Sequence, residues 1–224
     1  MQIRPGIEKA GTMILGLAFA GLLFRLLLLN MYSHGASGAG KQSMEAVKQL
    51  VGSPLWMFAG VMHVLVAVGL AALAARPTQA DQAVATLARV AAMIGAGCFL
   101  LLGMSHIHWA SAFDSAENVC CASEHSMMVA YNQFRMIVLG SGMFALGSCL
   151  LLNGFSHRYA GNKPEVTGWI AMVAGVLAVL HAFLPLPSNG LTVATLSAVI
   201  TWSAGQVIFG SRIHIGRFGI DDSE

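Results

Sequence analysis

Two arginines interrupt stretches of the sequence that are otherwise almost free of charge. Arg25 follows the run ILGLAFAGLLF, and Arg135 lies in MMVAYNQFRMIVLG. A charge at the centre of a membrane helix costs at least about 2.5 to 3.5 kcal/mol, so such residues usually have a partner or a function. No Asp or Glu occurs in either stretch. We therefore predict partners among loop carboxylates, backbone carbonyls, lipid phosphates or a bound anion. The competing interpretation is that both side chains snorkel to the lipid headgroups.

Four further polar residues lie in similarly apolar surroundings. Asn132 and Gln133 come just before Arg135, and hydrogen bonding between helices is the simplest explanation for them. His63 and His181 fall in the second and fifth apolar stretches. A neutral imidazole there can ligate haem iron or another metal, or simply bond to a neighbouring helix. The predicted ligand-binding set is therefore Arg25, His63, Asn132, Gln133, Arg135 and His181.

A second group of polar residues gathers between the third and fourth apolar stretches. Imidazole and thioether groups together suit copper, especially Cu(I), but the spacing here matches no specific metal motif. Histidines on a surface without a metal are the competing interpretation. Cys120 and Cys121 form a vicinal pair, not a CxxC motif, and spacing alone leaves their pairing open. The predicted weak metal set is His106, His108 and His125, with Met104, Met127 and Met128 nearby.

The elements that carry these residues are predicted to be membrane helices. Of the 224 residues, 56% are apolar and only 10% are charged, which is less than half the charged share of a soluble domain. The net charge of +2 does not favour nucleic acid as a partner. We predict an all-α integral membrane protein with a single domain over residues 1–224. Six stretches are long enough to cross a bilayer, namely Gly11 to Asn30, Leu55 to Ala75, Ala83 to Met104, Met128 to Leu152, Val166 to Leu184 and Leu191 to Gly210.

The distribution of basic residues predicts the orientation of these helices. If the N-terminus is cytoplasmic, eight Lys and Arg residues flank the inner ends and two lie in the outer loops. This bias follows the positive-inside rule and predicts that both termini are cytoplasmic. A chain rich in Ala, Gly and Leu with this bias is typical of a bacterial inner membrane. The inner set is Arg4, Lys9, Arg76, Arg89, Arg158, Lys163, Arg212 and Arg217, and the outer set is Lys41 and Lys48.

The sequence also contains matching segments in the same order in its two halves. LLLNMYSH at 27–34 returns as LLLNGFSH at 150–157, and AGVMHVL at 59–65 returns as AGVLAVL at 174–180. We interpret residues 1–110 and 123–217 as half-repeats of three helices each. Three is an odd number, so the halves would have opposite orientations, as in many transporters. Chance similarity between apolar segments is the alternative.

These features favour a small solute-binding or anion-binding transporter, or a channel-like protein, with a polar site in the outer third of the bundle. One alternative is a redox subunit that binds haem b or a quinone through His63 and His181. The other is a non-catalytic subunit or assembly factor of a larger membrane complex. Enzymatic activity is not expected, because no nucleotide-binding or hydrolase motif is present. The expected partners are the lipid bilayer and either other membrane subunits or further copies of the chain.

Overall fold

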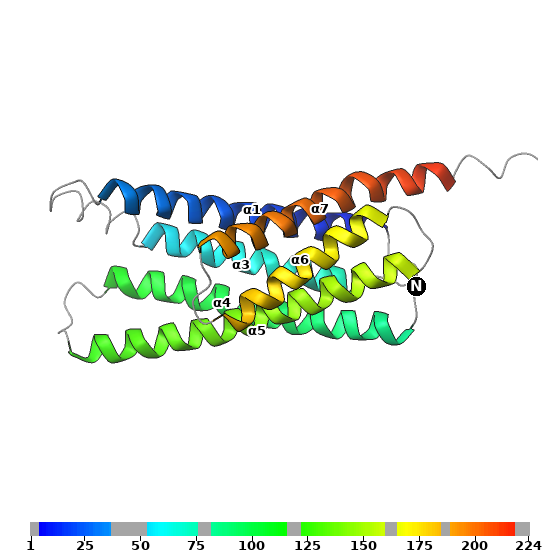
Figure 1. The fold of residues 1–224 in the computed structure, drawn as a ribbon. Helices are drawn as coiled ribbons and strands as arrows, with labels where there is room; N and C mark the ends of the chain where they lie inside the picture. The colour runs from blue at the N-terminus through cyan, green and yellow to red at the C-terminus, as the bar shows by residue number, and fades with distance from the viewer. Residues whose placement is uncertain are drawn as a thin grey trace, which may run out of the picture.

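The computed structural model describes residues 5–36, 53–75, 82–115, 122–159, 165–184 and 189–217. These residues form six long helices and no strand, which confirms the prediction of an all-α fold (Figure 1). The helices are α1 (Pro5–Ala36), α3 (Ser53–Ala74), α4 (Gln82–Ser115), α5 (Ala122–Tyr159), α6 (Glu165–Phe183) and α7 (Asn189–Arg217).

Every one of the six helices contains a stretch that is long and apolar enough to cross a membrane. The chain is therefore a multi-pass membrane protein. The stretches are Lys9–Met31, Pro54–Ala74, Ala83–Ser111, Val129–Phe155, Val166–Phe183 and Asn189–Ile208.

Helices α4 and α5 differ from the prediction because they reach further toward each other. The sequence predicted that the third span ends at Met104 and that a loop begins there. Instead, α4 continues to Ser115, and α5 begins at Ala122. The residues after Met104 are more polar, but none before Ser115 is Gly or Pro, so nothing breaks the backbone hydrogen bonds of the helix. His106 and His108 consequently lie on a helix.

The helices contact one another in a closed ring that follows the order of the chain. Each helix packs against the next, and α7 packs against α1. Successive helices run in opposite directions, so α1 begins and α7 ends at the same end of the bundle (Figure 1). The end of α1, the start of α3, the end of α4 and the start of α5 lie together at the other end (Figure 1). We call this second end the outer end, following the predicted orientation.

The burial pattern fits a bundle in a bilayer. The core contains large apolar side chains such as Phe19, Phe99 and Trp202, each 1% exposed. Equally apolar side chains cover the outside, including Ile137 at 69% and Phe183 at 72% exposure. Lipid tails are as apolar as the core, so such residues are at no disadvantage facing outward.

Glycines allow two pairs of neighbouring helices to touch through their backbones. A Cβ atom on Gly103 of α4 would lie 2.7 Å from the carbonyl oxygen of Gly60 in α3. A Cβ atom on Gly147 of α5 would lie 2.7 Å from the carbonyl oxygen of Gly175 in α6. Small residues at these positions are typical of helix contacts in membranes.

These contacts bear on the predicted repeat. The repeat matches Gly60 with Gly175, and it matches α1 with α5 and α4 with α7. Gly60 contacts α4, however, whereas Gly175 contacts α5, so the two matched glycines pack against helices that do not correspond. The ring of contacts follows the order of the chain and does not distinguish two half-repeats. The inverted repeat therefore stays a prediction.

Candidate functional site

Two arginines from different helices converge on one tryptophan at the outer end. The guanidinium carbon of Arg25, in α1, lies 5.6 Å from the ring centre of Trp56 in α3, and that of Arg135, in α5, lies 5.4 Å away. Both distances are typical of cation–π contacts. Arg25 also donates from Nε to the carbonyl oxygen of Leu55, at 3.1 Å. Leu55 and Trp56 are one and two residues inside the outer end of their apolar stretch, so both arginine side chains reach toward the outer end of the bundle and find protein partners there.

These two positive charges lie inside the apolar region. Arg25 is six residues before the end of its apolar stretch, and Arg135 is six residues after the start of its own. At about 1.5 Å per residue, each Cα lies roughly 9 Å below the outer boundary. Both side chains are half-buried. No Asp or Glu occurs in any of the six apolar stretches, so the spans offer these charges no carboxylate.

Two histidines stack against each other beside this pair. The rings of His63, in α3, and His106, in α4, lie 5.1 Å apart with 23° between their planes. Each histidine comes three residues after a glycine of the α3–α4 contact, in the segments AGVMH and LGMSH. The close approach of Gly60 and Gly103 brings these rings into contact.

Hydrogen bonds fix the orientation of both imidazoles. Nδ1 of His63 bonds to the carbonyl oxygen of Ala59, and Nδ1 of His106 bonds to that of Leu102, each at 2.7 Å. A carbonyl only accepts, so Nδ1 is the nitrogen that carries the proton in a neutral ring. Burial without a carboxylate favours neutral rings, because an unpaired buried charge is costly. Each Nε2 then has a lone pair for accepting a bond, and none of the described residues donates to it.

Aromatic rings connect the histidines to the arginines. Trp56 lies 5.0 Å from the ring of His106, and Tyr131 of α5 lies 6.2 Å from Trp56. The Tyr131 ring also stacks on Trp109 at 4.5 Å, with only 2° between the planes. The Tyr131 hydroxyl is buried without a hydrogen bond of standard geometry, although Ser105 lies close enough to interact with it. We call Arg25, Trp56, His63, His106, Tyr131 and Arg135 the outer cluster.

The structure brings together three of the six residues predicted to bind a ligand, namely Arg25, His63 and Arg135. Asn132 and Gln133 are exposed on α5. His181 lies apart on α6, where its Nε2 is 3.4 Å from the hydroxyl of Thr192 in α7. No contact within the described part of the chain joins His181 to His63.

His106 belonged to the predicted metal set and instead completes the outer cluster. His108, two residues along α4, is exposed. The side chain of His125 and the Cys120–Cys121 pair lie outside the described residues. Within the described residues, no three His, Cys, Asp or Glu side chains gather in a way that would hold a metal ion. The predicted copper site therefore gains no support from these residues.

Haem does not fit between His63 and His106 as they stand. Axial ligation by both rings would require a porphyrin between α3 and α4. The backbones of these helices touch at Gly60 and Gly103, three residues from the histidines, which leaves no room for that ring. The predicted haem ligand pair, His63 with His181, is not joined by any described contact.

Sequence reasoning missed Trp56, Tyr131 and the pairing of the two histidines. The repeated Gly-x-x-His pattern at Gly60–His63 and Gly103–His106 was the available signal. In two antiparallel helices that touch at these glycines, the two histidines lie one turn beyond the contact on opposite sides. Side chains on a helix tilt toward its N-terminus, so the two rings lean back toward the contact and meet there.

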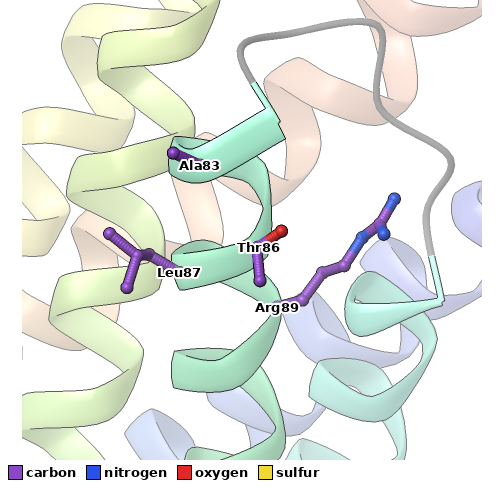
Figure 2. A pocket seen from close by; sticks show the side chains of 4 residues that line it. All are labelled: Ala83, Thr86, Leu87 and Arg89. Carbon is purple, nitrogen blue, oxygen red and sulfur yellow. The ribbon is translucent and has the colours of Figure 1, made fainter.

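A shallow hollow also occurs at the opposite end of the bundle, at the start of α4. Ala83, Thr86, Leu87 and Arg89 line it, and all four are exposed. Figure 2 shows that Leu87 and Arg89 point to different sides of the helix. Because these side chains do not converge, the hollow is an open surface and not a candidate site.

The described residues define a membrane protein with six apolar helices and with paired cationic and imidazole groups at one end of the bundle. No family model, curated protein or solved structure matches the chain. The physical character of the outer cluster is therefore the basis for inferring function.

Proposed function

We propose that this membrane protein binds an anion at the outer cluster and acts as a small transporter or channel-like protein. The observation that carries the proposal is the convergence of Arg25 and Arg135 on Trp56, in spans that contain no carboxylate. Like charges this close repel each other, and a bound anion relieves that repulsion. Each guanidinium offers planar, fixed donors that suit oxyanions.

The proposed orientation supports a role at the outer surface. The positive-inside bias favours cytoplasmic termini in a bacterial inner membrane. This orientation directs the outer cluster away from the cytoplasm. A soluble anion can then reach the arginines from outside, because both side chains are only half-buried.

Anion binding can be measured through thermal stability in detergent. A ligand that binds only the folded state stabilises it by about 2.7 kcal/mol at a hundred times its Kd. We expect at least one small oxyanion to raise the melting temperature of the wild-type protein at constant ionic strength. The variants Arg25→Gln and Arg135→Gln should lose this increase. Arg89→Gln is the matched control, because Arg89 is an exposed arginine at the opposite end of the bundle.

Two results would contradict the proposal. One is the absence of any anion-dependent stabilisation in the wild type across chloride, nitrate, sulfate, phosphate and carboxylates. The other is equal stabilisation of the wild type and Arg135→Gln. Flux of the binding anion into proteoliposomes then tests transport separately from binding.

A further inference from the structure

We infer that the ligand of the outer cluster is an oxyanion that keeps a proton, such as hydrogen phosphate or the singly ionised form of a phosphate monoester. This inference rests on the proposed anion site and specifies its selectivity. It follows from the two kinds of group that meet there. Arg25 and Arg135 provide donors and positive charge, whereas His63 and His106 provide only acceptor lone pairs at Nε2.

The two kinds of group meet at the ring of Trp56. Trp56 contacts both, with Arg135 at 5.4 Å and His106 at 5.0 Å from its ring centre. Arg25 and Arg135 also lie near enough to His106 to act on it electrostatically. His106 is five residues from the end of its apolar stretch, and the arginines are six residues from the ends of theirs. All three groups therefore lie at a similar depth.

A proton on the oxyanion determines whether the Nε2 acceptors of the histidines receive a hydrogen bond from the ligand. Sulfate and nitrate carry only acceptor oxygens, so beside His106 their oxygens would face the Nε2 lone pair. Phosphate at about pH 7 always keeps at least one proton and can donate P–O–H to Nε2. Sites built to bond a hydroxyl strongly reject analogues that lack it. The histidine pair should therefore select protonated oxyanions.

Sulfate and phosphate make a sharp comparison because both are tetrahedral and of similar size. Sulfate carries two full charges near neutral pH, so the two arginines alone would favour sulfate or show no preference. A preference for phosphate would therefore show that the histidine acceptors contribute to binding. We expect the wild type to bind phosphate at least about tenfold more tightly than sulfate, measured with radiolabelled anions on the purified full chain.

The decisive variant is His106→Asn. An Asn can keep the helix bond to the preceding turn, as Asn153 does by donating to the carbonyl oxygen of Cys149 at 2.9 Å. Its Oδ1 is still an acceptor, but the shorter side chain withdraws that acceptor from the position of Nε2. We expect this variant to bind sulfate as the wild type does but to lose the phosphate preference. His106→Phe, which keeps a stacking ring, should behave the same way, and His181→Asn should keep the preference.

The lipid and aqueous sources of a phosphate monoester are distinguished by nanodiscs. At about pH 5, below the second pKa of a phosphate monoester, phosphatidic acid keeps a P–O–H group, whereas phosphatidylcholine does not. Competition with radiolabelled phosphate by phosphatidic acid alone supports the inference and assigns a lipid source. Competition by neither lipid, with the phosphate preference intact, supports it and assigns a free anion. Equal competition by both lipids would overturn it.

The failures of the two proposals give different results. Equal binding of phosphate and sulfate by the wild type overturns the proton requirement and leaves the anion site intact. A phosphate preference that survives in both His106→Asn and His106→Phe also overturns the role of the histidine. Binding of neither anion, with no other anion stabilising the protein, overturns the proposed function itself.

Discussion

Two helix crossings in this bundle use the same packing device and give different chemistry. At the α3–α4 crossing, Gly60 and Gly103 touch, and at the α5–α6 crossing, Gly147 and Gly175 touch. Three residues after the first pair come His63 and His106. Three residues after Gly147 comes Leu150, which is fully buried in the hydrophobic core.

The difference shows how a common backbone contact is used for different purposes. The glycines determine how closely the helices approach, and the next inward-facing residue determines what fills the contact. Ala178, three residues after Gly175, is also fully buried. The second crossing is therefore apolar where the first carries histidines, and substitutions at both can separate packing from binding.

The largest expected effect is the loss of stability when either crossing is blocked. Gly103→Ala and Gly175→Ala each place a Cβ atom within 2.8 Å of a carbonyl oxygen on the neighbouring helix. Backbone cannot move aside cheaply, so we expect a loss of about 1 to 3 kcal/mol in the free energy of unfolding, measured in mixed micelles.

Gly97→Ala is the control for this prediction, because nothing lies within 4 Å of a Cβ atom there. Alanine has the higher helix propensity, so Gly97→Ala should be neutral or stabilising by up to about 1 kcal/mol. Equal stability losses at all three glycines would show that the crossings are not tight contacts.

A similar or smaller effect is expected when the leucine that fills the apolar crossing is removed. Leu150→Ala should destabilise the protein by about 2 kcal/mol, at the low end of the range for buried leucines. The low value is expected because lipid tails are as apolar as the core. The substitution therefore removes packing contacts but little hydrophobic transfer energy. Binding of anions by the folded protein should not change. A loss of anion affinity in folded Leu150→Ala would contradict the separation between the two crossings.

The sequence predicted the architecture well because hydropathy directly reflects the energy of a helix in lipid. The ends of α4 and α5 were predicted poorly, since a helix can continue past the apolar region when no Gly or Pro breaks it. Arg25 and Arg135 were recognisable from sequence alone because a buried charge is rare and costly.

The partners of these arginines were harder to predict. His63 was assigned to a set with His181 because both lie in spans matched by the repeat. The structure pairs it with His106 through the Gly60–Gly103 contact. Which faces of two helices meet depends on how each helix is rotated about its own axis. Hydropathy does not reveal this rotation in a chain that is apolar on nearly every side. The Gly-x-x-His pattern does indicate which face of α3 and of α4 is turned toward the other helix.

The smallest expected effect concerns His181, the buried histidine outside the outer cluster. Its bond to Thr192 is long, at 3.4 Å, and side-chain bonds between membrane helices average about 0.6 kcal/mol. Thr192→Val should therefore reduce the free energy of unfolding by less than about 1 kcal/mol and leave the anion affinity of the folded protein unchanged. Thr192→Ser keeps a hydroxyl and serves as its control. A large drop in anion affinity in Thr192→Val alone would place His181 in the binding site and would remove the contrast between the histidine of α6 and the pair at the α3–α4 crossing.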